Sequence, residues 1–235
     1  MSKFKSTPTL TTYTEWQEAY DFFNRELFEE RLPHNIFVLD NNGKRVLGYF
    51  AAERFTSDEG EIRDVIAMNP RYFFVYSIMD IFGVLVHEMC HCWRFRFGKD
   101  PKKNTNGYHD REWGRKMESL GLIPSNTGKP DGKKVGYQMH HYILAGESFE
   151  VACQKLLAEN FHISWGDRFV NLGSMSSEEY QKLQDKGLVL STTSKRTRWK
   201  FQCPGCGDNA WGKAALVLVC GKCKLGFKLL PEIGS

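Results

Sequence analysis

The spacing of hydrophobic residues changes once within the first third of the chain. Between Thr14 and Pro33 apolar side chains recur every three or four positions, which predicts a helix with Thr14 as its N-cap that ends before Pro33. Apolar and polar residues then alternate, which predicts strands at 35–40, 45–55 and 61–69. The connections between these strands are short and rich in turn residues, so we expect an antiparallel meander.

A longer apolar run follows and predicts a second helix over residues 78–97. Ser77 and Asp80 loosely fit a capping box at its start, and Gly98 is typical of a helix end. Apolar residues lie on nearly every side of this helix, which is typical of a helix buried in a core. We therefore expect the hydrophobic core to surround it.

The elements after this helix are shorter. A polar loop at 99–107 leads to a predicted helix at 109–121, and the Gly- and Lys-rich stretch 124–136 indicates another loop. Further helices are predicted at 147–161 and 176–187. The pattern as a whole predicts helices combined with a small antiparallel sheet.

The buried helix carries the sequence HEMCH, which contains His87, Glu88 and His91. Four helical residues advance about 400°, so the two histidines share one face, whereas Glu88 lies about 100° to the side. From there its carboxylate can accept a proton from a metal-bound water without being a ligand. The alternative is a pair of core histidines bonded to the backbone. Because buried polar groups need partners, we favour a divalent cation.

Catalytic zinc usually takes three protein ligands, so a third ligand must come from downstream. The candidates are His109, Glu112, Glu118, His140 and His141. His109 is preferred because it precedes a predicted helix on a turn that can fold back over the histidine helix; Glu112 and Glu118 are its main rivals. Cys90 and Cys92 are interpreted as buried packing residues rather than ligands.

Four cysteines near the C-terminus form a second pattern. CPGC and CGKC are separated by thirteen residues and supply Cys203, Cys206, Cys220 and Cys223. Two such pairs are typical of a tetrahedral structural zinc site, and the interval suits a β-hairpin, so we predict a zinc ribbon. Disulfides are the alternative, but a reducing compartment disfavours them.

The compartment follows from what the sequence lacks. No apolar run reaches the length of a membrane span, and the N-terminal residues have no hydrophobic segment of a secretory signal. We therefore expect a cytoplasmic protein without a membrane partner.

The ribbon segment is strongly basic. Residues 195–228 contain eight basic residues and one acidic residue, so the remainder of this chain of net charge +4 carries −3. Cations interleaved with aromatic residues can hold phosphates and stack unpaired bases. The candidate nucleic-acid contacts are Lys195, Arg196, Arg198, Trp199, Lys200 and Lys213. A solvated linker is the simpler alternative.

Several motifs together resemble the SprT-like metallopeptidases, whose eukaryotic member is Spartan. They are FNRELFEERLP, MNPRYF, LVHEMCHCW and GYHDREWGRKMESLGL, followed by a four-cysteine ribbon with NAWGK. The resemblance covers residues 14–145 and 196–228. It implies a bacterial-type member in which His87, His91 and His109 bind zinc and Glu88 is the general base. It also implies DNA-dependent cleavage of proteins crosslinked to DNA.

These observations lead to one overall expectation. The fold is α+β, with a zincin-like peptidase domain at 1–145, a helical connector at 146–194 and a β zinc ribbon at 195–235. The chain is expected to be a monomeric zinc endopeptidase of the bacterial cytosol or nucleoid, with one catalytic and one structural Zn²⁺. Its partners are protein substrates and DNA, single strands included.

The sequence does not decide which residue stabilises the oxyanion, nor does it exclude a second function. The candidate donors to the oxyanion are Tyr108, His141 and Tyr142. The rival function is a non-catalytic DNA-binding zinc adaptor or regulator with a vestigial peptidase site.

Overall fold

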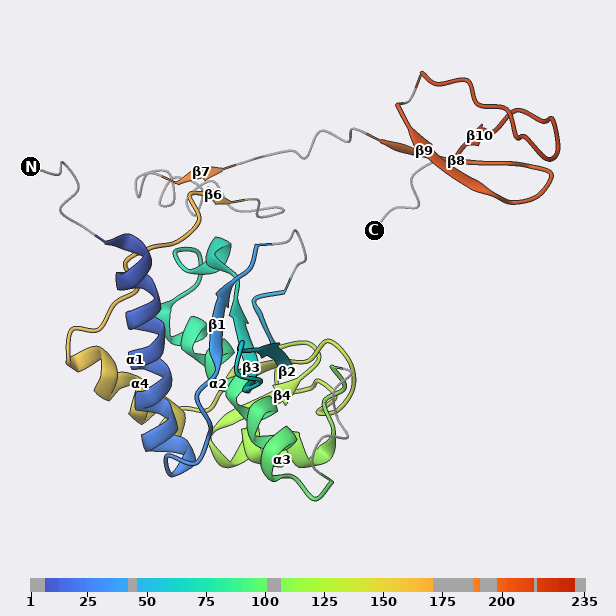
Figure 1. Ribbon diagram of the computed structural model, residues 1–235. Coiled ribbons are helices and arrows are strands. Elements are labelled where there is room, and N and C mark those ends of the chain that lie inside the picture. The colour runs from blue at the N-terminus through green and yellow to red at the C-terminus, as the bar shows by residue number, and fades with distance from the viewer. Residues whose placement is uncertain are drawn as a thin grey trace, which may run out of the picture. The chain divides into compact units, whose positions relative to one another are not determined.

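The computed structural model describes residues 7–41, 46–100, 107–170, 188–190, 198–213 and 215–230 (Figure 1). The chain divides into two compact units. The first contains residues 1–170 and 174–190, and the second contains residues 171–173 and 191–235. Each unit has its own strands, and the α+β fold class is confirmed.

The first helix, α1, extends from Pro8 to Phe28 and therefore begins earlier than predicted. Pro8 occupies the first helical position, where its fixed φ angle favours the helix and its missing N–H is not needed. Thr7, not Thr14, is the residue before the helix. The helix ends where Glu29 adopts a left-handed conformation with φ of 57°. Asn24 fixes the following turn by exchanging two hydrogen bonds with the Leu32 backbone.

The three predicted strands are β1 (Ile36–Leu39), β2 (Gly48–Thr56) and β3 (Ile62–Met68). Their order in the sheet is β1-β3-β2, with β3 antiparallel to β2 but parallel to β1. The predicted meander is therefore wrong for β1. Five consecutive residues of β3 are buried, which is typical of a central strand covered on both faces.

Helix α2 extends from Ile78 to Phe97, as predicted, and the Ser77 hydroxyl accepts a hydrogen bond from the Asp80 amide at its start. Asp64 of β3 is buried and accepts two hydrogen bonds from Arg96, which anchors the last turn of α2 to the sheet. A short 3₁₀ turn, η1 (Pro70–Tyr72), precedes α2.

The core of the first unit lies between α1, α2 and α4 (Ser148–Ala158). The Phe23 ring of α1 contacts Phe82 of α2 and Phe149 of α4, with centroids 5.3 and 6.0 Å apart. Helices α1 and α4 lie side by side (Figure 1). The proposed domain boundary at residue 146 stays a prediction, but α4, which follows it, packs into this same core.

Helix α3 (Arg111–Ser119) is shorter than predicted at both ends, and Asp110 caps its first turn. Strands β4 (Leu122–Ser125) and β5 (His140–Ile143) form an antiparallel pair that the sequence did not reveal. Two short strands, β6 (Phe169–Val170) and β7 (Val189–Leu190), pair in parallel. The helix predicted at 176–187 lies outside the described residues.

The second unit contains a three-stranded sheet with the order β10-β8-β9. Its strands are β8 (Trp199–Gln202), β9 (Asn209–Gly212) and β10 (Lys228–Leu229). The hairpin formed by β8 and β9 encloses the first cysteine pair, whereas the sequence suggested a hairpin between the two pairs. In the part of the chain that the structure describes, no helix is long and apolar enough to cross a membrane.

Candidate active site

Three histidines converge at the middle of α2. His87 and His91 lie one turn apart on that helix, and His109 lies just before the N-cap of α3. One ligand nitrogen from each of them lies within 4.8 Å of the other two. The Nε2 atoms of His87 and His109 are 3.1 Å apart. The structure therefore brings together the three residues that the sequence selected.

The backbone holds His109 in place. His109 and Gly136 form a β-bridge with N···O distances of 2.9 and 3.0 Å, and the Nδ1 of His109 lies 3.0 Å from the Gly136 carbonyl oxygen. A carbonyl only accepts, so this Nδ1 carries the proton and donates it. The Nε2 of His109 consequently keeps its lone pair and faces His87, which is the usual arrangement of a metal-binding histidine.

Burial keeps the histidines neutral. Desolvation lowers the pKa of His87 and His91 well below the usual value of 6.5, and it also lowers the pKa of His109. The indole of Trp113 packs against all three rings, with centroids 4.4 Å from His109, 4.8 Å from His87 and 5.1 Å from His91. Sequence reasoning missed Trp113. Its position four residues after His109, one helical turn away, was the feature of the sequence that could have indicated this contact.

The carboxyl of Glu88 lies beside the cluster. One of its oxygens is 4.0 Å from His87 Nε2, and only 7% of its side chain is exposed. Burial raises the pKa of Glu88 to about 8, and a backbone hydrogen bond with Phe50 opposes that shift. The 4.0 Å distance places this side chain beside the histidine nitrogens, as the helical spacing predicts.

His141 of β5 contacts the other side of His87. The two Nδ1 atoms are 3.4 Å apart, so His141 lies opposite to the Nε2 that faces His109. Gly83, one turn before His87, leaves room for this ring, because a Cβ at that position would lie 2.7 Å from His141 Nε2. Burial lowers the pKa of His141 to about 4, so this imidazole is also neutral.

The donor set fits a zinc ion. Zn–N bonds of about 2.0–2.1 Å in a tetrahedral site place two ligating nitrogens about 3.3 Å apart, close to the spacing of His87 and His109. Neutral imidazoles are also the form that binds metal. Two other candidate ligands form ion pairs, Glu112 with Arg94 and Glu118 with Lys134. A third candidate, His140, is exposed.

Comparison with known proteins agrees with this geometry. The model of the SprT-like family matches residues 16–130, which contain all three histidines and Glu88. The chain belongs to the SprT-like family. Over 52 residues it is 46% identical to an uncharacterized protein in the mucB 3′ region of Salmonella typhimurium, covering 22% of this chain and 69% of that protein. No solved structure matches the chain.

The matched region of this SprT-like chain is a metallopeptidase-like domain. Of the two tyrosines considered as oxyanion donors, Tyr108 lies within this matched region and Tyr142 lies after it in the chain. The Tyr108 ring packs against Tyr137 with centroids 5.1 Å apart, and Tyr142 lies on β5 opposite Ile123. The oxyanion role stays a prediction for both, whereas the position of His141 behind His87 favours a different role.

The ribbon cysteines also converge. One sulfur from each of Cys203, Cys206, Cys220 and Cys223 lies within 4.8 Å of the others, and the Sγ atoms of Cys206 and Cys220 are 3.6 Å apart. Four sulfurs about 2.3 Å from a tetrahedral zinc lie about 3.8 Å from one another. The amide of Cys223 donates to the sulfur of Cys220 and lowers its pKa to about 7. The cluster is consistent with a structural zinc site.

Part of the proposed nucleic-acid surface is visible on the ribbon. Lys200 of β8 pairs with Trp211 of β9, and its ammonium lies 6.0 Å from the centre of that indole. Trp211, which the sequence reading did not single out, is 61% exposed. Arg198 and Lys213 are exposed and Trp199 is half-buried, whereas Lys195 and Arg196 lie outside the described residues.

Proposed function

We propose that this chain is a zinc-dependent endopeptidase that acts on proteins bound or crosslinked to DNA. The observation that carries the proposal is the convergence of His87, His91 and His109 with the carboxyl of Glu88 beside them. Three neutral histidines leave a fourth position of a tetrahedral ion for water or substrate, which distinguishes catalytic from closed structural sites.

The three histidines would hold the ion through nitrogen lone pairs. A bound zinc ion supplies Lewis acidity, which lowers the pKa of water and polarises a peptide carbonyl. The raised pKa of the Glu88 carboxyl would fall beside a bound dication, and the carboxylate is then close enough to accept a proton from the attacking water and to return it to the leaving amine. Trp113 covers the rings on one side and excludes water from them.

We further propose that His141 is a positioning residue. When Nε2 of His87 binds a metal, its Nδ1 carries the proton and donates it to Nδ1 of His141. His109 is fixed in the same way by the Gly136 carbonyl. His109 therefore presents an unprotonated Nε2 before any ion arrives, and His87 does so in the tautomer in which its Nδ1 donates to His141, so little reorganisation is needed on binding.

The DNA part of the proposal is supported by charge and by the family resemblance. The basic ribbon segment presents Lys200 beside the exposed ring of Trp211. Cations bind phosphates, and an exposed indole can stack on an unpaired base. DNA binding would bring the peptidase to DNA-bound substrates, so specificity need not come from a deep pocket for substrate side chains.

A cleavage assay with and without single-stranded DNA tests this function. A DNA-binding protein substrate, and the chain itself as a substrate for autocleavage, are incubated with zinc-loaded wild type and with Glu88→Gln. We expect DNA-stimulated cleavage by the wild type and a loss of about 10²–10⁴-fold in the variant, with zinc content and melting temperature unchanged. Wild-type DNA binding without any cleavage would favour the adaptor function instead.

A further inference from the structure

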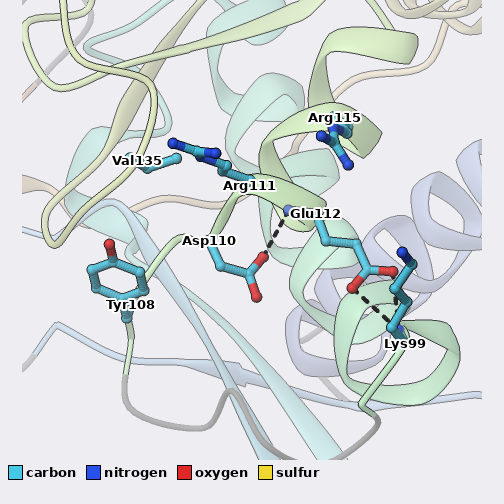
Figure 2. Close-up of a pocket in the computed structure, with 7 residues that line it drawn as sticks. All are labelled: Lys99, Tyr108, Asp110, Arg111, Glu112, Arg115 and Val135. Carbon is cyan, nitrogen blue, oxygen red and sulfur yellow. Dashed lines mark hydrogen bonds between the residues drawn. The ribbon is translucent and has the colours of Figure 1, made fainter.

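A pocket of about 490 Å³ opens beside the first turn of α3, next in the chain to His109 (Figure 2). We call it the arginine pocket. Its lining is mostly charged and consists of Lys99, Tyr108, Asp110, Arg111, Glu112, Arg115 and Val135. The active-site histidine lies between two of these lining residues, Tyr108 and Asp110. A ligand held here would therefore lie close to the catalytic cluster.

The two acidic residues of the arginine pocket share one cation, Arg94. Arg94, whose side chain is 9% exposed, forms ion pairs of 2.9 Å with Asp110 and 3.3 Å with Glu112. Asp110 also accepts from two amides at the start of α3, and Glu112 accepts from the Lys99 amide. Arg94 offsets one of the two negative charges, so the three cations of the lining exceed the remaining negative charge by two.

The cations of the pocket are not engaged in this way. Within the described residues, the structure gives no hydrogen bond or ion pair to the side chain of Arg111, Arg115 or Lys99. Arg111 and Arg115 lie one helical turn apart, so both project from the same face of α3. Figure 2 shows the Arg111 side chain reaching toward Val135 and the Arg115 side chain further along α3. These groups therefore supply positive charge that no described residue pairs with.

The surrounding segment is basic as well. Residues 99–136 contain nine basic and five acidic residues, a net charge of +4. Apart from this segment and the ribbon segment 195–228, the rest of the chain sums to −7. Positive charge is therefore concentrated in two places, and one of them borders the histidine cluster. A basic stretch of this extent matches a polyanion better than a single carboxylate of a peptide.

We propose that the arginine pocket binds phosphates of a nucleic-acid backbone. Arg111 and Arg115 each offer a planar fork of N–H donors that suits two phosphate oxygens, and Lys99 adds a point charge. The inference rests on the proposed DNA partner but not on peptide cleavage. It places nucleic acid on the peptidase unit itself, in addition to the ribbon. A DNA-bound substrate would then lie next to the histidine cluster.

The test uses the zinc-loaded full chain in a Glu88→Gln background, so that cleavage cannot interfere. Binding of a fluorescein-labelled 20-nucleotide single strand is measured by anisotropy at several salt concentrations. The pocket variant is Arg111→Gln with Arg115→Gln. The control variant is Arg25→Gln with Lys155→Gln, two exposed cations near Glu26 on α1 and α4 that change net charge equally.

We expect the pocket variant to bind about tenfold more weakly near physiological salt and the control to bind like the parent. The slope of log K against log salt should fall by about 1.4, since each single-strand phosphate contact contributes about 0.7. Equal affinity and slope in both variants would overturn phosphate binding at the pocket but leave the ribbon as a DNA site. No binding by the parent chain would overturn the DNA partner as well. Unchanged DNA binding with an altered preference of the Glu88-intact enzyme for acidic peptides would assign the pocket to the protein substrate and overturn the proposal.

Discussion

The two candidate metal sites of this chain differ in the size of the hydrophobic core that surrounds them. Two of the three histidines lie on α2, whose other faces pack into a large core that includes Phe82, Leu85 and Met89, all fully buried. The cysteine cluster lies in a unit where the buried residues, among those described, are Phe201, Cys203 and Cys220. Two of these three are themselves ligand candidates.

Metal binding should therefore contribute differently to the folding of the two units. We expect the first unit to fold without metal, because burial of its aromatic and aliphatic side chains supplies stabilisation. Its metal site is then a preorganised feature of a fold that already exists. The ribbon buries too little apolar surface to fold by that means, so its metal would contribute directly to the free energy of folding.

The largest predicted effect is the loss of one ligand in the ribbon. Cys220→Ser should unfold the second unit, since metal binding in comparable zinc modules contributes roughly 10–16 kcal/mol. The matched variant His91→Ala should leave the first unit folded, with a loss of about 1–2 kcal/mol, while its metal is lost. Zinc content and amide hydrogen exchange of each unit report both outcomes.

Either of two results would contradict the contrast. One is a protected, native-like ribbon in Cys220→Ser. The other is global unfolding of the first unit in His91→Ala when metal-free wild type keeps its structure. Metal-free wild type is therefore the control for both variants.

Thiol labelling sharpens the same contrast. Burial raises the pKa of Cys92 and Cys153 to about 12, and it also raises the pKa of Cys90. At pH 8 these residues remain thiols, and the reactive thiolate of Cys92 is about a thousandfold scarcer than for an ordinary cysteine. Because chelation should unfold the ribbon and turn its four cysteines into exposed, ordinary thiols, iodoacetamide should modify those four quickly and the three core cysteines only in denaturant. Mass spectrometry counts the labels, and fast labelling of Cys90 in the folded protein would contradict this view of the core.

The parts that the sequence predicted are local ones. Helix α2, its cap at Ser77 and the common face of His87 and His91 all depend on residues within one or two turns. The four-cysteine cluster likewise follows from spacing. The start of α1 was missed because capping by Thr14 and initiation at Pro8 are both locally acceptable, and packing of the extra turn is a tertiary matter.

The parts that could not be predicted depend on contacts between distant segments. His109 is fixed by Gly136, which lies 27 residues away. The parallel pairing of β1 with β3 reflects burial of β3 on both faces, which a period-two pattern does not encode. The space that Gly83 leaves for His141 depends on how β5 approaches α2. The sequence named His141 but not the side of His87 that it contacts.

The smallest predicted effect concerns this last contact. His141→Gln should weaken zinc binding at the histidine site about 10–100-fold, as loss of outer partners of metal-binding histidines typically does. The matched variant His140→Gln changes the exposed neighbour on the same strand and should leave affinity unchanged. Competition with a chromogenic chelator measures affinity without reference to cleavage. Gly83→Ala should reproduce the loss, because its Cβ displaces the His141 ring, and should add little to His141→Gln. If His141→Gln lowered the cleavage rate but kept the zinc affinity of wild type, His141 would act on the substrate, as an oxyanion donor does, and not on His87.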